Sequence, residues 1–515
     1  MILVTADEMR AIDSRAINDY KIPSLELMEN AGRGIFHYIE EVVAPEIEEE
    51  PAIAIVCGRG NNGGDGFVVG RYLFEAGYDV VFLLAGTDEK LSDDCRVNYD
   101  KVIAAGYEVV QVTKERDIPD LHEFDLIIDA IFGTGFSGAP RGISAKLIDH
   151  INASHAHIVS VDAPSGLDVS TGKAETMAVM ADFTTTLALP KPGLYVSPGR
   201  EFAGFVAIIP IGIPQEVVES FGIQKYLIND HKVAHTLPQP KPDGHKGDFG
   251  KVFILAGSPG LTGAAYLSGL AAARSGAGLV TVGVPKSLNP ILEMKLTEVM
   301  TVPLPEVGKR SVLALRGKGE IRQHIKGKDA IAIGPGIGRH HETGELIRRL
   351  IGDITCPCVI DADGLYPLSG EDSPLLQQHG PLVLTPHPGE FARLTGETPS
   401  AHPLDNFELV AKWAKTFNAV IVLKGSPTII GTPEGEVYMN STGNFGMATG
   451  GSGDVLTGII VTMLAQGLEP LRAAGCGVFI HGLAGDMAIE HINPRSLIAG
   501  DVIEFLSSAF DALIH

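Results

Sequence analysis

The 515-residue chain is poor in cysteine and tryptophan and has no long hydrophobic run. It carries five cysteines and one tryptophan. An odd cysteine count in a chain of this length argues against a disulfide framework. No apolar stretch reaches the roughly 18 residues that a membrane span needs, and the opening residues Met1 to Glu8 lack the cationic flank of a signal peptide. We therefore expect a cytoplasmic protein.

Basic residues are also scarce. The chain has 40 Lys and Arg against 63 Asp and Glu, a formal net charge of −23, which argues against nucleic acid or an anionic membrane as a partner. The imbalance is uneven: residues 1–230 hold 36 acidic and 17 basic side chains (−19), whereas residues 231–515 hold 27 and 23 (−4). The two parts therefore look like separate modules, and the acidic one would need backbone N–H groups or a cation to bind phosphate.

Histidine and cysteine do not cluster in a way that indicates a transition-metal site. Cys356 and Cys358 are separated by one residue, which is too close for the usual zinc or thioredoxin spacing. We expect them to be buried thiols at the start of a strand.

A chain of this length is too long for one hydrophobic core, so two domains are expected. The segment Thr236–His245 holds three prolines and a glycine, a composition typical of an extended linker. A strand-like run begins at Lys251. We place the boundary near residue 235, which gives domains 1–235 and 236–515.

Short apolar runs alternate with helical patterns in both modules, and this alternation predicts an α/β fold with parallel sheets covered by helices on both faces. Thr5 and Glu8 form a capping-box pattern, and a second helix is expected over 25–43. The predicted strands are 52–57, 80–84, 126–132, 158–161 and 205–209, then 252–256, 279–284, 330–333, 359–361, 382–385 and 420–423. Ligands of such sheets bind at the carboxyl ends of the strands.

A glycine-rich segment, residues 58–66, follows the first predicted strand and precedes a helical stretch at 67–76. Its glycines match the dinucleotide fingerprint, and Asp88 lies near the distance expected of a ribose-binding acid. Two features oppose that interpretation. The Asp65 carboxylate would crowd a pyrophosphate, and hydride transfer has no evident use for the side-chain carbonyls of Asn61 and Asn62.

Side-chain oxygens in a loop suit a hard cation. Besides the asparagines, Asp129 and Ser165 follow other predicted strands, so three strand ends of one sheet can converge on one ion. Singly, each residue also fits an ordinary turn or cap.

Together, the segments 27–32, 60–66, 129–135 and 162–166 resemble the NAD(P)H-hydrate epimerase domain. The resemblance covers roughly residues 1–220 and implies a Rossmann-like fold that interconverts the R and S forms of hydrated NAD(P)H. It also implies a potassium ion held by Asn62, Asp129 and Ser165, with Asp162 handling protons near the altered ring. The implied contacts to the hydrated nucleotide are Asn61, Asn62, Gly63, Gly64, Asp65, Gly133, Thr134, Gly135, Phe136, Ser137, Gly138, Ala139 and Asp162.

Near the C-terminus, residues 444–454 hold several glycines around Asp454 and lead into the apolar stretch 455–463. Glycines at a helix N-terminus offer N–H groups to a phosphate. A carboxylate there repels the anion, but it makes sense if Asp454 takes a proton from a hydroxyl that meets the phosphate. The alternative is a glycine-rich turn with Asp454 as a helix cap.

The second module resembles the ADP- or ATP-dependent NAD(P)H-hydrate dehydratases of the ribokinase-like group, through segments 276–279, 334–338, 361–365, 385–390, 423–428 and 450–454. The resemblance implies that Asp454 is the base, that phosphorylation makes the hydroxyl a good leaving group, and that Mg²⁺ accompanies the nucleotide. The implied contacts to hydrated NAD(P)H are Ala264, Gly338, His387 and Asp454; those to ADP or AMP are Lys424, Gly425, Ser426, Pro427, Thr428 and Gly453. His387 also fits a surface or capping histidine, and Asp361 and Asp363 fit structural loop residues, so both aspartates stay outside the catalytic set.

The sequence therefore predicts a bifunctional repair enzyme that epimerises hydrated NADH and NADPH and dehydrates the S form, with ADP giving AMP and phosphate. The fused arrangement favours ADP over ATP. A homo-oligomer is compatible with the resemblance, although no interface can be read from the sequence. Two rival hypotheses remain: a ribokinase-class small-molecule kinase fused to a dinucleotide-binding domain, and a nucleotide-binding sensor or scaffold with a decayed first domain.

Overall fold

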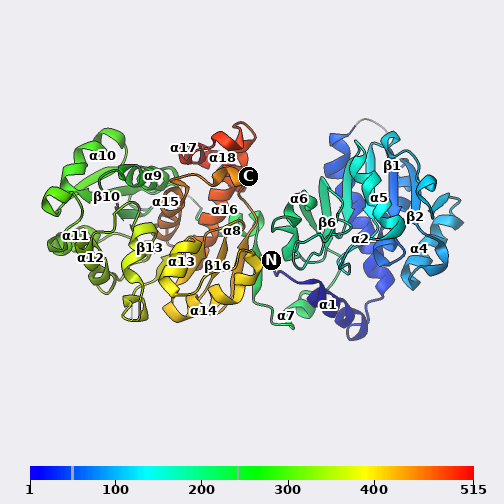
Figure 1. Ribbon diagram of the computed structural model, residues 1–515, viewed down its shortest axis with the longest axis horizontal. Coiled ribbons are helices and arrows are strands. Elements are labelled where there is room, and N and C mark those ends of the chain that lie inside the picture. Colours follow the sequence, from blue (N-terminus) through cyan, green and yellow to red (C-terminus); the bar gives the residue numbers. More distant parts are fainter. Residues whose placement is uncertain (48–50, 240–242, 378, 515) are drawn as a thin grey trace. The chain divides into compact units, whose positions relative to one another are not determined.

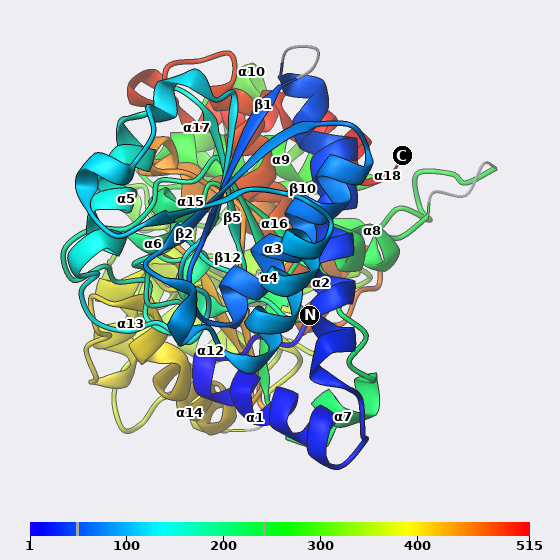
Figure 2. The same ribbon diagram turned by 90° about the vertical axis from the view of Figure 1, so that its right-hand side faces the viewer.

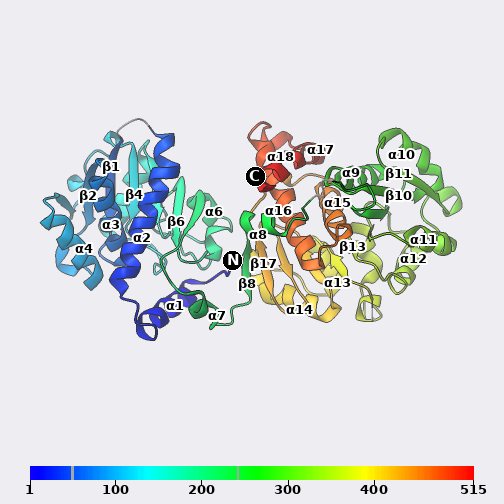
Figure 3. The same ribbon diagram turned by 180° about the vertical axis from the view of Figure 1, so that it is seen from behind.

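A computed structural model describes residues 1–47, 51–239, 243–377 and 379–514. The chain divides into two compact units, Met1–Ile223 and Gln224–His515 (Figure 1). The boundary therefore precedes the one expected near residue 235. The reason is β8 (Lys225–Ile228), which pairs in parallel with β17 (Val437–Asn440) in the sheet of the second unit (Figure 3). The middle of the expected linker, residues 240–242, lies outside the described residues.

The first unit contains a seven-stranded parallel sheet with the order β3-β2-β1-β4-β5-β6-β7. All five strands predicted for this module are present. The sequence did not reveal β3, which is short and only partly buried, or β6, whose threonines interrupt the apolar pattern. The bounds are β1 Ala52–Cys57, β2 Asp79–Ala85, β3 Val109–Val112, β4 Leu126–Ala130, β5 His157–Val161, β6 Phe183–Leu187 and β7 Phe205–Ile209.

Helices cover both faces of this sheet. Figure 2 shows α2, α3 and α4 on one side and α5 on the other. Alternate residues of β1 divide between the two cores: Ile53 and Ile55 pack toward α2 and α3, while Ala54 and Val56 pack toward α5, as the two-residue period of a strand requires. The helices are α1 Ala6–Asn18, α2 Ser24–Tyr38, α3 Asn61–Glu75, α4 Asp93–Ala104, α5 Gly142–Ala153, α6 Gly199–Ala203 and α7 Gln215–Glu219.

Two details of these helices bear on the sequence analysis. The capping box before α1 is confirmed, because the Glu8 amide donates to Thr5 Oγ1 (3.3 Å) and the Thr5 amide donates to Glu8 Oε2 (2.8 Å). The helix expected over 25–43 is α only to Tyr38 and continues as a single π-turn over Ile39–Val43.

The second unit contains a ten-stranded sheet with the order β11-β10-β9-β12-β13-β14-β15-β16-β17-β8. All six predicted strands are present. The pairs from β11 to β15 are parallel, whereas β15/β16 and β16/β17 are antiparallel. The bounds of the strands not yet given are β9 Lys251–Leu255, β10 Leu279–Pro285, β11 Met300–Leu304, β12 Ala330–Ile333, β13 Cys358–Ile360, β14 Leu382–Leu384, β15 Val420–Leu423 and β16 Ile429–Gly431.

Two helical layers enclose this second sheet. One core lies beneath α8 Asp230–Thr236, α9 Thr262–Arg274, α10 Asn289–Lys295, α15 Ser452–Ala465, α16 Pro470–Ile489, α17 Ala499–Glu504 and α18 Leu506–Ile514. The other lies beneath α11 Lys318–Ile325, α12 His341–Ile351, α13 Pro388–Thr395 and α14 Phe407–Phe417.

The helices α9 and α15 lie in close contact. A Cβ atom on Gly458 would stand 2.4 Å from the carbonyl oxygen of Ser268, so only glycine allows this approach. The contact fixes α15, and with it the position of Asp454 in its first turn. Among the described helices, none combines the length and the apolar character that crossing a bilayer would need.

Candidate active sites

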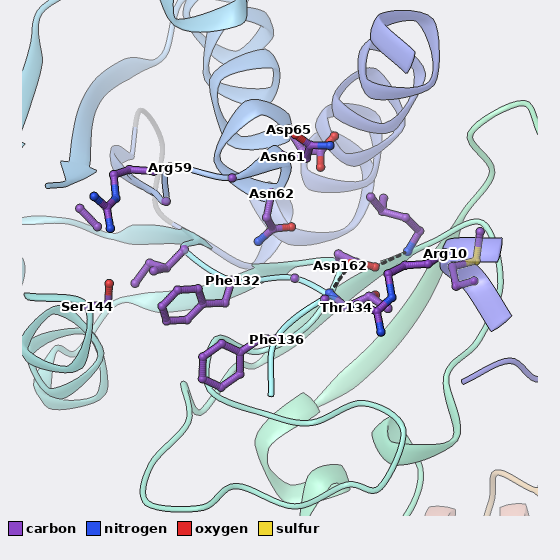
Figure 4. A pocket seen from close by; sticks show the side chains of 18 of the residues that line it. Arg10, Arg59, Asn61, Asn62, Asp65, Phe132, Thr134, Phe136, Ser144 and Asp162 are labelled. Atoms are coloured by element: carbon purple, nitrogen blue, oxygen red, sulfur yellow. Dashed lines mark hydrogen bonds between the residues drawn. The ribbon is translucent and has the colours of Figure 1, made fainter. Parts of the chain in front are cut away.

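The first unit has a cavity of about 720 Å³ at the carboxyl ends of its strands. The loops after β1, β4 and β5, the start of α3 and part of α1 form its walls (Figure 4). The rings of Phe132 and Phe136 stack on one wall, with centroids 4.5 Å apart. The predicted contact residues that line this cavity are Asn61, Asn62, Asp65, Gly133, Thr134, Gly135, Phe136, Ala139 and Asp162.

The predicted glycine-rich loop is instead the beginning of a helix, since α3 begins at Asn61. Helical spacing places Asn61, Asn62 and Asp65 on the face toward the cavity. Gly63 and Gly64 lie on the other face, where an added Cβ would stand 1.9 Å from the Gly58 carbonyl oxygen and 2.7 Å from the Met28 sulfur, respectively. These two glycines therefore serve packing rather than lining the cavity. Ser137 and Gly138 also lie outside its lining.

Asp162 and Lys191 form a buried ion pair at the floor of the cavity. Lys191 Nζ lies 2.9 Å from Asp162 Oδ1, and the Thr134 amide donates to Asp162 Oδ2 at 2.7 Å (Figure 4). The Leu187 amide also donates to Oδ1, at 3.3 Å. Burial works against the carboxylate, but the Lys191 ammonium and the Thr134 hydrogen bond outweigh it, and the pKa of Asp162 lies below its usual value. Asp162 is therefore an ionised group with both oxygens already engaged.

Asp129 and Ser165 contact each other beneath the cavity. Ser165 Oγ donates to Asp129 Oδ1 at 2.5 Å, and the Ser165 amide donates to Oδ2 at 2.8 Å. Ser160 Oγ adds a bond to Oδ2 at 2.9 Å. Burial raises the pKa of Asp129, although these hydrogen bonds oppose the shift. The structure thus brings together two of the three residues expected to bind a cation.

The third of these residues, Asn62, is buried and has no partner. Neither its Oδ1 nor its Nδ2 forms a hydrogen bond within the part of the chain that the structure describes. A Cβ atom on Gly133 would stand 2.7 Å from Asn62 Oδ1 and 2.8 Å from Asp162 Oδ2, so the loop passes between the two side chains only because it carries glycine there. A buried amide without a protein partner is costly, which is typical of a group that awaits a ligand.

Two further carboxyls, those of Asp13 and Asp65, line the cavity, and no sequence pattern pointed to Asp13. Asp13 comes from α1, far from every glycine-rich loop, and its Oδ1 is buried without a hydrogen-bond partner among the described residues. Burial raises the pKa of Asp13 to about 6, against the influence of Lys191 and with that of Asp162. Burial, followed by the charges of Asp162 and Asp13, raises the pKa of Asp65 well above its usual value.

The second unit has a cavity of about 580 Å³ bounded by the ends of β14, β15 and β17 and by the start of α15. Of the residues predicted to contact substrates in this unit, those that line it are His387, Lys424, Gly425, Ser426, Thr428 and Gly453. Pro427 is buried and does not line the cavity, and neither do Ala264, Gly338 and Asp454.

Lys424, which was expected to contact ADP or AMP, forms an ion pair. Its Nζ donates to Asp361 Oδ1 at 2.7 Å, and Glu390 Oε2 lies 3.9 Å away. Thr457 Oγ1 donates to the other oxygen of Asp361 at 2.8 Å. Burial lowers the pKa of Lys424, but the Asp361 and Glu390 carboxylates outweigh this and raise it. Asp361, which the sequence analysis set aside as a loop residue, therefore lies at the centre of this network.

Asp454 lies in the first turn of α15, but it does not cap the helix. The N-cap is Gly451, with φ of +96°, and no side-chain cap bond to the first turn forms within the described residues. Burial and the nearby Asp361 carboxylate raise the pKa of Asp454 to about 7, although Lys424 opposes the shift. A carboxyl with this pKa beside free helix amides can accept a proton near neutral pH.

His387 is the N-cap of α13: its Nδ1 accepts from the amides of Gly389 (3.0 Å) and Glu390 (3.4 Å). The capping interpretation is therefore correct, and the side chain also reaches the cavity. A residue that sequence reasoning missed is His481 on α16, whose Nε2 lies 3.2 Å from Ser452 Oγ. Burial lowers the pKa of His481 to about 4, so the ring is neutral.

Ala264 lies in the first turn of α9, and Gly338 lies in the loop that follows β12. A Cβ on Gly336 would stand 2.9 Å from Ala264 Cβ, and the Gly338 amide donates to Asp363 Oδ2 at 3.1 Å. Asp363 also accepts from Arg339 Nε at 2.8 Å. Asp363 is therefore a loop-forming residue, as expected.

The fold and the two cavities define a two-domain α/β enzyme with a carboxyl of raised pKa in the first turn of α15. Comparison with known proteins agrees. A family described as NAD(P)H-hydrate dehydratase matches residues 252–506, and one described as YjeF-related protein N-terminus matches residues 24–193. The chain is 43% identical to the bifunctional NAD(P)H-hydrate repair enzyme Nnr of Moorella thermoacetica, over 98% of this chain and 96% of that one.

The corresponding enzyme of Escherichia coli K12 is 32% identical over 97% of this chain and 92% of its own length. A solved structure of the ADP/ATP-dependent NAD(P)H-hydrate dehydratase of Bacillus subtilis, co-crystallised with ATP/Mg²⁺, is 31% identical and covers 56% of this chain and 98% of that one, with a TM-score of 0.48. The chain belongs to the family of bifunctional NAD(P)H-hydrate repair enzymes.

Proposed function

We propose that the protein restores damaged nicotinamide coenzymes: its first unit equilibrates the R and S forms of hydrated NADH and NADPH, and its second unit dehydrates the S form at the expense of a nucleoside phosphate. The observation that carries the second activity is Asp454, a carboxyl poised to take a proton beside the free amides of α15. Membership of the family over 98% of the chain disfavours both rival hypotheses, the fused small-molecule kinase and the sensor with a decayed first domain.

In the second unit, Asp454 takes the proton of the ring hydroxyl, and the hydroxyl oxygen attacks the terminal phosphorus of the nucleotide. With ADP the leaving group is AMP. Inorganic phosphate then leaves the ring carbon, a proton leaves the neighbouring carbon, and the ring double bond is restored. The free amides at the start of α15 and the Lys424 ammonium stabilise the negative charge that develops on the phosphoryl oxygens.

Asp361 has a positioning role in this proposal. It holds Lys424 at the cavity wall and, as a neighbouring negative charge, keeps the Asp454 pKa high. A nucleotide phosphate that approaches Lys424 competes with Asp361 for the ammonium. Mg²⁺ bound to the nucleotide phosphates would supply the remaining counter-charge; we keep ADP as the expected donor and ATP as the alternative.

In the first unit, a potassium ion fits the residues present. The unpartnered Oδ1 of Asn62, the Asp129 carboxylate and Ser165 Oγ are hard oxygen donors with one negative charge in total, which suits a monovalent ion. When bound, the ion would supply a fixed positive charge in a unit that is otherwise strongly acidic. The amides at the start of α3 would then contribute to phosphate binding.

We infer a cytoplasmic location, because the five cysteines are unpaired and reduced thiols are typical of a reducing compartment. The proposed partners are small molecules, namely hydrated NADH or NADPH and ADP. A homo-oligomer stays an open prediction.

The decisive experiment mixes the purified protein with hydrated NADPH, Mg²⁺ and either ADP or ATP. Recovery of the absorbance of the reduced coenzyme, together with release of inorganic phosphate, supports the proposal. A phosphorylated product without recovery of NADPH would instead identify a kinase. Supplying pure R form tests the first unit, because only epimerisation makes it available to the second.

A further inference from the structure

The carboxyls of Asp13, Asp65 and Asp162 line the cavity of the first unit, although an epimerisation at one ring carbon needs only one group to transfer the proton. Asp162, the residue expected to handle protons, has both oxygens engaged by Lys191, Thr134 and Leu187. A carboxylate held in this way is a weak base, because accepting a proton would break its bonds. Its position makes it an anchor for the Lys191 ammonium and for the loop that carries Thr134.

Asp13 differs from Asp162 in its place in the fold and in its hydrogen bonding. It lines the same cavity, it comes from α1, and its buried Oδ1 has no hydrogen-bond partner among the described residues. We propose that Asp13 is the proton-transfer residue of the first unit and that Asp162 is a positioning residue. This inference rests on the proposed epimerase function and names the group that performs it.

The surroundings of Asp13 support this assignment. Lys191 and Asp162 face it from the loops after β6 and β5, Asp65 faces it from α3, and Arg10 lines the cavity from the same helix as Asp13. Together these groups and burial give Asp13 a pKa of about 6, while the pKa of Asp162 lies below its usual value. When the surroundings of two carboxyls push their pKa values apart in this way, the two groups take different roles in the reaction. A base works best when its pKa lies near the operating pH.

The chemistry needs only one such group. In the hydrated ring, the hydroxyl sits on the carbon bonded to the ring nitrogen, so that carbon is a hemiaminal. Asp13 takes the hydroxyl proton, the carbon–oxygen bond becomes a carbonyl, and the carbon–nitrogen bond breaks with its electron pair moving to nitrogen. Asp13 then gives the proton to that nitrogen. Rotation about the adjacent carbon–carbon bond and the reverse steps close the ring with the opposite configuration, with no net change in protons or electrons.

The test compares the full-length protein with Asp13→Asn, which keeps the shape of the side chain but cannot accept a proton. The conversion of pure R hydrate to S hydrate is measured above its spontaneous rate from about pH 5 to pH 8. We expect the turnover to fall by about 10²-fold or more, while the substrate concentration at half-saturation changes little. The rise in rate toward neutral pH should disappear. Dehydration of pure S hydrate by the second unit should stay at the wild-type rate.

Two variants make the result specific. Asp19→Asn alters an exposed carboxylate that pairs with Arg15 at the end of the same helix, and it should epimerise like the wild type. Asp13→Glu should recover part of the activity with a displaced pH profile. If Asp13→Asn does not fold, Asp13→Glu decides the matter: a displaced profile supports the proposal and an unmoved one overturns it.

The outcomes separate this inference from the proposed function. A wild-type protein that does not accelerate epimerisation at all would overturn the function of the first unit. A wild-type protein that does so, with Asp13→Asn within about threefold of it and with the same pH profile, would overturn only the assignment to Asp13.

Discussion

Lys424 and Asp361 form an ion pair, 2.7 Å from Nζ to Oδ1, that joins the end of β15 to the end of β13. The Asp361 side chain is 2% exposed and that of Lys424 is 21% exposed. Since Thr457 donates to the remaining oxygen, the pair links two strands of the parallel sheet to α15. Lys424, which is predicted to contact the nucleotide, therefore also stabilises the fold of the second unit.

This relationship predicts that Lys424→Ala destabilises the protein. Removing the ammonium leaves the Asp361 carboxylate buried without its charged partner, which costs about 3 kcal/mol or more. Urea unfolding of the second unit should show the loss. The matched control is Lys412→Ala, because Lys412 pairs with Glu397 on the surface, with side chains 57% and 42% exposed, and should cost about 1 kcal/mol or less. Equal losses in the two variants would contradict the prediction.

Dehydration should depend on the ionisation of Asp454. The residue acts as a base only when deprotonated, so the rate should rise with pH through an apparent pKa near 7 and level off above it. Above pH 7, Asp454→Asn should lower the turnover by about 10²-fold or more while epimerisation continues. Full recovery of NADPH by a folded Asp454→Asn protein would refute the assignment.

The same carboxyl should weaken the fold at alkaline pH. Because the folded-state pKa of Asp454 is raised from 3.8 to about 7, its contribution to stability is fully present below about pH 4 and is lost as the pH rises through 7. Asp454→Asn cannot ionise, so at about pH 8 it should be more stable than the wild type by up to about 4 kcal/mol. Denaturant unfolding at pH 5 and pH 8 measures the difference, which should shrink at the lower pH.

Potassium should stabilise the first unit. An ion that binds only the folded form raises its unfolding free energy in proportion to the logarithm of the ion concentration. We expect the melting temperature of the first unit to be higher in potassium chloride than in choline chloride at equal ionic strength. Asn62→Ala should abolish this increment, because it removes the unpartnered Oδ1. An increment of unchanged size in Asn62→Ala would exclude that residue as a ligand.

The sequence predicted the fold class and most strands because buried parallel strands are short, continuous apolar runs such as Ala52–Cys57 and Ala330–Ile333. It could not show that residues 61–66 are helical, because Asn and Gly favour turns in isolation and only the packing of α3 against α2 and β1 overrides that preference. The face of that helix decides which of the predicted residues line the cavity.

Asp13, which the sequence analysis missed, and Asp361, which it set aside, share one property. Asp13 and Asp361 reach their sites through long-range contacts, from α1 and from the end of β13, and neither stands inside a glycine-rich segment. Their importance comes from the charges that surround them, Lys191 in one case and Lys424 in the other. No local sequence pattern shows which charged residues the fold will bring together.

The pairing of Lys225–Ile228 with Val437–Asn440 determines how the two activities can be separated by truncation. A fragment that begins at residue 236 would lack the outermost strand of its sheet, and the bare backbone of β17 would be free to template pairing with other chains. Such a fragment should aggregate. A fragment that begins at Gln224 keeps β17 paired with β8 and should stay monodisperse.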